Sequence, residues 1–203
     1  MSASGSMTMS RGFANPALDS QAVFRAILKA MSEPGRVIEC PVPVPSAPLP
    51  PVIAAVALTM LDYETPIFLA GDLSREAPAA FLAFHTGAPL VSKPGQASIV
   101  LALTPNELPT IAELEAGTPA YPDRSATVIV GVTGFGSGAL VSLRGSGIAG
   151  TRDFMADGLD TAFWKAAIEN AARFPSGVDF IFCGLRSLAA MPRSTIPDLL
   201  RSD

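Results

Sequence analysis

A single histidine, His85, is the only imidazole that the chain offers for acid–base or nucleophilic chemistry. A Ser-His-Asp triad would need it as the general base. No Gly-x-Ser-x-Gly elbow supports a triad, because Gly136-Ser137-Gly138 falls in an expected glycine-rich turn. His85 also closes an apolar segment with helical spacing, where the helix dipole favours its protonated form. We therefore expect a packed, helix-terminal histidine and keep a binding role for His85 as the alternative.

Metal and pyridoxal sites have little support in the residue types and their spacing. Zinc needs four N, S or O ligands, and neither Cys-x-x-Cys nor His-x-x-x-His occurs. Asp62 and Glu64 could hold Mg²⁺ from a loop, but we favour solvated carboxylates at a helix end. Lys93 is the one lysine placed to form a Schiff base with pyridoxal phosphate, and nothing near it resembles a pyridinium partner. We expect neither a metal nor a cofactor.

The segment Gly145–Gly150 is a literal G-x-G-x-x-G that follows an expected strand. A dinucleotide site also requires a helix that starts inside the motif, so that the pyrophosphate meets free N–H groups. Here the next expected helix starts only near Thr161. We interpret Gly145, Gly147 and Gly150 as parts of a structural turn and keep contact with a phosphate or nucleotide as the alternative.

The most polar segment of this apolar chain is Tyr121-Pro122-Asp123-Arg124-Ser125. Asp123 and Arg124 can pair locally in a structural loop, which is the interpretation that we favour. Arg124 can instead hold a phosphonate or a partner's carboxylate through its planar guanidinium group. Both residues therefore remain candidates for binding a ligand or a partner.

Composition limits the possible partners. Charged residues make up 16% of the 203 residues, against about 25% in a typical soluble domain. Either the core is large, or part of the surface is apolar and covered by another chain. The net charge is −4 and the basic residues form no run, so we expect no nucleic acid and no anionic membrane as partner.

The chain has the length of one domain with a substantial core. Residues 1–11 lack the apolar segment of a signal peptide, so we expect a disordered lead followed by a single domain over residues 12–203. The longest apolar stretch, Val52–Leu61, is too short to span a membrane, which indicates a cytoplasmic protein. Cys40 and Cys183 lie far apart at the ends of expected strands, and we expect buried free thiols.

Apolar spacing predicts helices and strands that alternate along the chain. Helices are expected at Asp19–Met31, with Asp19 or Ser20 as the cap, and at Val52–Leu61, Ala77–His85, Glu107–Glu115 and Thr161–Ala172. Strands are expected at Arg36–Cys40, Pro66–Ala70, Ala97–Leu103, Thr127–Val132, Ala139–Arg144 and Val178–Cys183.

Two further features of this pattern set the expected fold. Pro41–Pro51 contains six prolines and is expected to be an extended connector. Thr127–Val132 and Ala139–Arg144 flank the glycine-rich turn Gly134–Gly138, which indicates a hairpin. The pattern predicts an α/β fold: a three-layer α/β/α sandwich with a mixed sheet of about six strands.

Several short segments, taken together and in order, resemble members of the PhnH family of bacterial carbon–phosphorus lyase systems over about residues 12–195. They are Gly12-Phe13-Ala14-Asn15-Pro16, Asp19-Ser20-Gln21, Phe24-Arg25, Met31-Ser32-Glu33-Pro34-Gly35, Leu61-Asp62-Tyr63-Glu64-Thr65-Pro66, Phe84-His85-Thr86-Gly87-Ala88, Gly117-Thr118, Tyr121–Thr127, Gly145–Gly150, Phe174-Pro175-Ser176-Gly177-Val178-Asp179 and Met191-Pro192-Arg193-Ser194-Thr195. The chain departs from the expected pattern at Asn15, where Asp is expected, and at Ser176, where Leu is expected.

The resemblance implies a fold like the large domain of pyridoxal-dependent transferases, without the cofactor lysine. It implies a homodimer that joins the PhnG, PhnI and PhnJ subunits in a core complex. That complex uses ATP and an alkylphosphonate to form a ribose-linked phosphonate triphosphate, before radical cleavage of the carbon–phosphorus bond. The radical step needs an iron–sulfur cluster bound by cysteines, which this chain with two distant cysteines cannot hold alone.

We therefore predict an accessory, non-catalytic subunit of the carbon–phosphorus lyase core complex. The alternative is an enzyme or binding protein that takes up a nucleotide or phosphonate by itself, through the Gly145–Gly150 turn and Arg124.

Overall fold

The computed structural model describes residues 10–45 and 47–200. Within them, helices alternate with strands, as the apolar spacing predicts. The helices are α1 (Pro16–Ser32), α2 (Pro51–Met60), α3 (Glu76–Thr86) and α4 (Thr161–Ala171). Most of the expected N-terminal lead, residues 1–9, lies outside the described residues.

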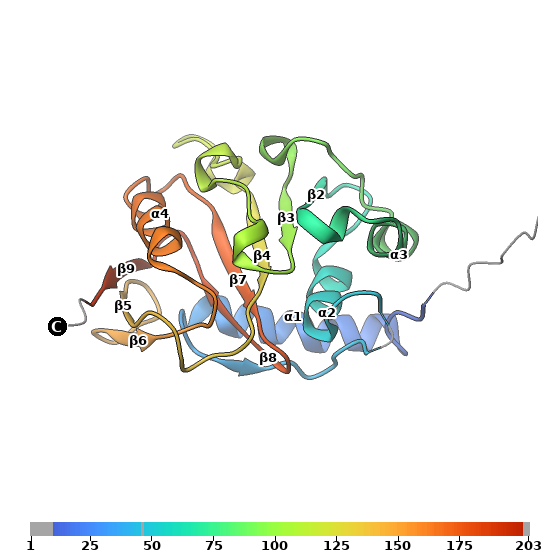
Figure 1. Cartoon of the computed structure of the whole chain (residues 1–203), viewed down its shortest axis with the longest axis horizontal. Coiled ribbons are helices and arrows are strands. Elements are labelled where there is room, and N and C mark those ends of the chain that lie inside the picture. Colours follow the sequence, from blue (N-terminus) through green and yellow to red (C-terminus); the bar gives the residue numbers. More distant parts are fainter. Residues whose placement is uncertain (1–9, 46, 201–203) are drawn as a thin grey trace, which may run out of the picture.

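Six strands form the main sheet, in the order β1-β8-β7-β4-β3-β2 (Figure 1). They are β1 (Ile38–Glu39), β2 (Ile67–Leu69), β3 (Ile99–Ala102), β4 (Thr127–Gly131), β7 (Asp179–Cys183) and β8 (Ser187–Met191). Strands β2, β3, β4 and β7 are parallel, β8 is antiparallel to β7, and β1 is antiparallel to β8. The predicted α/β fold with a mixed sheet is therefore confirmed.

A second sheet contains three antiparallel strands. They are β6 (Arg152–Phe154), β5 (Val141–Arg144) and β9 (Ile196–Leu199), with β5 in the middle. The predicted hairpin between Thr127–Val132 and Ala139–Arg144 is wrong, because β4 and β5 belong to different sheets. Both edges of β4 are already occupied by its parallel neighbours β3 and β7. The glycine-rich loop therefore carries the chain from the main sheet to the second sheet.

The predicted helix over Glu107–Glu115 is also wrong. Two short 3-10 turns, Pro105–Glu107 and Ile111–Glu113, take its place. Pro109 lies between them, and a proline inside a helix lacks the N–H donor and clashes with the preceding turn. Leu108 is extended, with φ −64° and ψ 136°, so the chain runs straight between the two turns.

Helix α1 begins at Pro16 rather than at the predicted Asp19. Asn15 is the N-cap, and its side-chain oxygen accepts a hydrogen bond from the Leu18 N–H at 3.5 Å. The Asp19 carboxylate accepts in return from the Asn15 N–H at 2.8 Å. Asp19 and Ser20 thus lie inside the helix, and Pro16 takes the first helical position, which suits proline.

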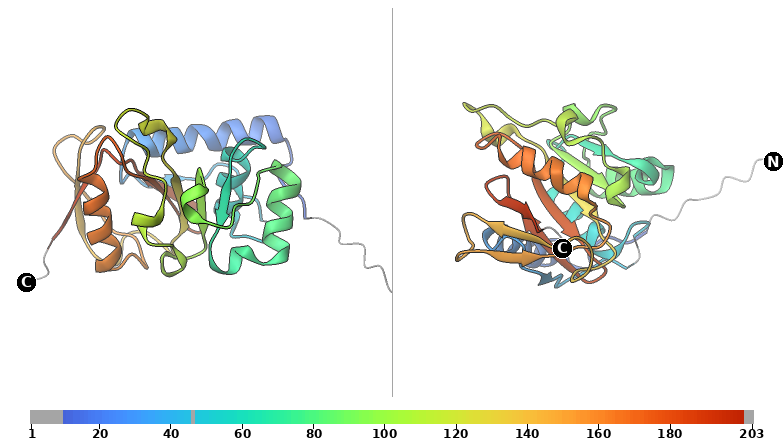
Figure 2. Two further views of the ribbon diagram at one scale, coloured as in Figure 1. Left: turned by 90° about the horizontal axis from the view of Figure 1, so that it is seen from above. Right: turned by 60° about the vertical axis from the view of Figure 1, so that its left-hand side comes forward.

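Two apolar cores lie on opposite faces of the main sheet. Helices α1 and α2 cover one face, and α4 with the second sheet covers the other, while α3 lies at the β2 edge (Figures 1 and 2). Neighbouring residues of β4 separate accordingly: Ile129 joins the first core, and Val128 and Val130 join the second. Trp164 of α4 packs there edge-to-face against Phe154.

Cys40 and Cys183 are free and buried in the first core, as predicted. Desolvation raises the pKa of both thiols, and for Cys183 the neighbouring Cys40 raises the pKa further.

We expect neither thiol of the folded protein to react with a disulfide reagent at pH 8, because both are covered and remain protonated. Both should react once the chain is unfolded in denaturant. The unfolded chain releases these protons first, so stability should fall as the pH rises above about 8.5. Stopped-flow thiol titration with and without denaturant measures the reactivity of the two thiols. Urea unfolding at several pH values measures the change in stability. Rapid reaction of either cysteine in the folded state would contradict the buried placement.

Candidate functional site

His85 lies in the last turn of α3, where it is exposed and contacts the chain at Ser10. Its Nε2 donates a hydrogen bond to the carbonyl oxygen of Ser10 at 2.9 Å. Its ring centroid lies 4.5 Å from that of Phe81 and 5.0 Å from that of Phe84. A Cβ added to Gly12 would lie 3.1 Å from His85 Nδ1. His85 thus fastens the start of the described chain to α3, away from the other candidate residues.

Asp62 is held by its own turn. Its Oδ1 accepts a hydrogen bond from the Thr65 hydroxyl at 2.6 Å and another from the Glu64 N–H at 2.9 Å. These hydrogen bonds lower the pKa of Asp62, and the bond from Thr65 has the largest effect. Among the described residues, no group of three His, Cys, Asp or Glu side chains is arranged to hold a metal ion.

The polar segment Tyr121–Ser125 forms a 3-10 turn over Pro122–Arg124. The guanidinium carbon of Arg124 lies 4.5 Å from the centroid of the Tyr121 ring, within cation–π range. Asp123 and Arg124 are both exposed. Among the ion pairs of the described residues, none joins these two side chains. The local pairing considered from the sequence is therefore replaced by stacking of Arg124 on Tyr121.

The Gly145–Gly150 turn joins the antiparallel strands β5 and β6, and no helix starts inside it. Gly145 and Gly147 have φ of 137° and 83°, which favours glycine. A Cβ at Gly145 would lie 2.7 Å from the Ser194 carbonyl oxygen, and one at Gly147 would lie 2.1 Å from the Ser32 carbonyl oxygen. These two glycines let the turn pack against the end of α1 and the segment before β9. Gly150, with φ 78°, faces open space.

The least exposed ion pair of the described residues joins Arg193 to Asp179, the first residue of β7. Arg193 Nη2 lies 2.5 Å from Asp179 Oδ2, and Nε donates to Oδ1 at 3.1 Å. The Arg193 backbone N–H also donates to Oδ1, at 2.7 Å. Nη1 donates to the Pro122 carbonyl oxygen. The two side chains are only 17% and 12% exposed, so the pair is largely desolvated.

A cavity of about 390 Å³ opens beside this ion pair. Its polar lining consists of Asp123, Asp179, Arg193 and Ser194. Its apolar lining comes from Met31, Phe174 and three prolines. We call this cavity the Arg193 pocket.

The structure brings two of the predicted regions to the Arg193 pocket. Asp123 lines it directly, and the Gly145 end of the glycine turn packs against Ser194 in its wall. Arg124 stacks on Tyr121 and does not line it. Sequence reasoning missed Arg193 and Asp179 as site residues. The available signal was a carboxylate that opens the otherwise apolar strand Asp179–Cys183, because a buried charge needs a partner.

The charge of the Arg193 pocket limits what it can bind. Two carboxylates and one guanidinium group line it, and the guanidinium group is already paired with Asp179. A phosphonate or triphosphate would therefore meet a net negative lining. The exposed Asp123 and the apolar walls suit a neutral or cationic group on an apolar stem.

A second cavity, of about 340 Å³, lies at the carboxyl ends of β3, β4 and β7. Ligands of open α/β sheets bind at this edge. Thr104, Thr133 and Asp157 give its lining polar groups, and the buried Cys183 also lines it. Asp157 accepts a hydrogen bond from the Ser137 hydroxyl. None of the residues singled out from the sequence as binding candidates lines this cavity.

Comparison with known proteins matches residues 11–197 to the PhnH family, described as bacterial phosphonate metabolism protein (PhnH). A relative from Rhizobium meliloti (strain 1021) is named alpha-D-ribose 1-methylphosphonate 5-triphosphate synthase subunit PhnH. It is 31% identical, over 94% of this chain and 96% of its own. A relative from Stutzerimonas stutzeri, named putative C-P lyase subunit protein HtxG, is 37% identical over 39% of this chain and 40% of its own.

We expect Arg193→Ala to lower the free energy of unfolding by about 3–5 kcal/mol, because it leaves the Asp179 carboxylate buried without its partner. The matched control is Arg36→Ala, whose pair with Glu33 is 51% and 30% exposed. It should cost much less, because this pair is exposed to solvent. Urea unfolding of both variants makes the comparison. Equal losses of stability in the two variants would show that the Arg193–Asp179 pair contributes no more than the exposed Arg36–Glu33 pair.

Proposed function

The chain belongs to the PhnH family of bacterial phosphonate metabolism proteins, and from this premise we propose that it is an accessory subunit of a carbon–phosphorus lyase assembly. In this role it supports alkylphosphonate breakdown without carrying the bond-breaking chemistry itself. The observation that carries the proposal is the match along nearly the whole chain to a relative named as a subunit.

The partners proposed for the chain are the PhnG, PhnI and PhnJ subunits and, in the isolated protein, a second copy of itself. Exposed apolar side chains support a role in protein association. On α1, Leu18, Phe24 and Leu28 are 63%, 44% and 51% exposed. We place the protein in the cytoplasm. No helix of the described residues is long and apolar enough to cross a bilayer.

The finer fold assignment is part of the same proposal. Residues 12–203 form one domain, arranged as a three-layer sandwich similar to the large domain of pyridoxal-dependent transferases. Support comes from the packing of helices on both faces of one mixed sheet. Asp123 in the Arg193 pocket is the candidate residue that we assign to contact with a partner's basic group.

The test of this function combines association with growth. We expect the tagged chain to co-purify with the other subunits of the assembly, and its deletion to abolish growth on methylphosphonate as the sole phosphorus source. Growth of the deletion strain on inorganic phosphate is the control. The proposal fails if the chain binds none of the subunits and the deletion strain still grows on methylphosphonate.

The alternative, binding of a nucleotide or phosphonate by the chain alone through Arg124 and the Gly145–Gly150 turn, is tested by calorimetry. We expect titration of ATP and of methylphosphonate to give no micromolar binding, because Arg124 stacks on Tyr121 and no helix starts inside the Gly145–Gly150 turn to supply free N–H groups. Micromolar binding that is lost in Arg124→Ala, with Arg75→Ala as the control for an exposed arginine, would favour the alternative.

A further inference from the structure

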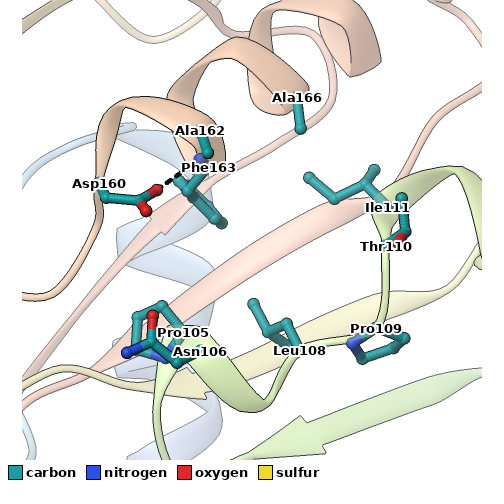
Figure 3. A pocket seen from close by; sticks show the side chains of 10 residues that line it. All are labelled: Pro105, Asn106, Leu108, Pro109, Thr110, Ile111, Asp160, Ala162, Phe163 and Ala166. Atoms are coloured by element: carbon teal, nitrogen blue, oxygen red, sulfur yellow. Dashed lines mark hydrogen bonds between the residues drawn. The ribbon is translucent and has the colours of Figure 1, made fainter.

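A groove runs along α4, between this helix and the extended segment that joins the two 3-10 turns. Its central cavity, of about 260 Å³, lies between Leu108 and Ile111 on one side and Phe163 and Ala166 of α4 on the other (Figure 3). A cavity of about 230 Å³ continues it past Ala166 toward Arg173. We call the two cavities together the α4 groove.

The two cavities adjoin, and Thr110, Ile111 and Ala166 line both of them. At its other end the α4 groove lies beside the cavity at the carboxyl ends of the strands, and Pro105 and Asn106 line both. From Ala162 to Ala171, where α4 ends, the helix rises about 14 Å. That length matches roughly four residues of extended chain.

The depth of the α4 groove follows from the residues on its two walls. Ala162 and Ala166 lie one helical turn apart and contribute only methyl groups to this wall, beside the Phe163 ring. The opposite wall is a single extended strand of chain around Pro109, where a continuous helix would have filled the space. Among the described residues, no backbone N–H donates to the carbonyl oxygens of Leu108 and Pro109. Leu108 and Pro109 both line the groove, so these acceptors lie beside any main chain that enters it.

Charge distinguishes the two ends of the α4 groove. Asp160 lies at the end nearest the sheet, and Asp157 lies in the adjoining cavity, while no basic side chain lines either cavity within the described residues. The two carboxylates outweigh the half positive charge of the α4 N-terminus. At the far end, Glu169 and Arg173 balance each other.

We propose that the α4 groove binds an extended, apolar segment of another subunit of the assembly, with a Lys or Arg side chain of that segment at the Asp160 end. This inference rests on the proposed accessory-subunit function and adds the surface and the chemistry of the partner. The apolar floor receives the segment's side chains, and the free carbonyl groups of the wall pair with its main chain. The carboxylates fix the direction in which the segment lies.

The first test fills the groove. Ala166→Trp, or Ala162→Arg if the tryptophan variant does not fold, should weaken binding to the remaining subunits by about tenfold or more. Lys165→Trp is the matched control, because Lys165 is an exposed residue of the same helix that does not line the groove. Its affinity should stay within about twofold of the unsubstituted protein. Biolayer interferometry against the assembly purified without this chain measures the binding, and circular dichroism verifies the fold.

The second test separates charge from helix capping. Asp160 accepts the Phe163 N–H at 2.8 Å as the N-cap of α4. Asp160→Asn keeps a good cap and removes the charge. It should weaken binding by about two- to fivefold and reduce the dependence of binding on salt.

The third test identifies the occupant. A photo-cross-linking residue at position 162 should capture a segment of another subunit that contains Lys or Arg, whereas the same residue at position 165 should not. Cross-links only to a second copy of this chain would overturn the proposal. So would unchanged affinity of a folded Ala166→Trp or Ala162→Arg variant while the unsubstituted protein binds. If the unsubstituted protein binds no subunit, the accessory-subunit function fails together with the groove.

Discussion

Strand β4 has both edges and both faces covered, and this burial constrains the rest of the fold. Its edges pair with β3 and β7, and its alternate residues enter the two opposite cores. A strand in this position needs packed elements on both faces of the sheet. Helices α1 and α2 cover one face, and the connection that leaves β4 carries the elements that cover the other. The connection from β3 to β4 contains the two 3-10 turns and the polar Pro122–Arg124 turn, and the connection from β4 to β7 contains β5, β6 and α4.

The α4 groove lies where these two connections meet. One wall belongs to the connection before β4 and the other to the connection after it. Pro109 prevents the first wall from becoming helical. The small side chains of the alanines of α4 leave space at the second wall. A groove made this way depends on backbone conformation and on small side chains. It therefore leaves little trace in the pattern of charged or aromatic residues.

The Arg193 pocket has a different physical basis. Asp179 opens a buried strand, so its carboxylate must find a partner within the protein. Arg193 supplies that partner and also binds the Pro122 carbonyl oxygen, which ties the polar turn to β7. The same pairing neutralises the guanidinium group. The pocket that results carries its free charge on Asp123, and this changes the expected ligand from an anion to a neutral or cationic group.

The sequence alone determined the features that depend on local chemistry. Apolar periodicity located the four helices and most strands of the main sheet, and the burial of both cysteines followed from their neighbours. The PhnH resemblance was also visible in short segments along the chain, and the family match extends over residues 11–197. Local spacing could not determine pairing, because an apolar strand such as β4 is compatible with a hairpin or with two parallel neighbours. Only the tertiary structure placed β5 in a second sheet, joined Arg193 to Asp179, and set the extended segment around Pro109 opposite α4. Each of these depends on residues far apart in sequence, whose contact is set by packing rather than by spacing.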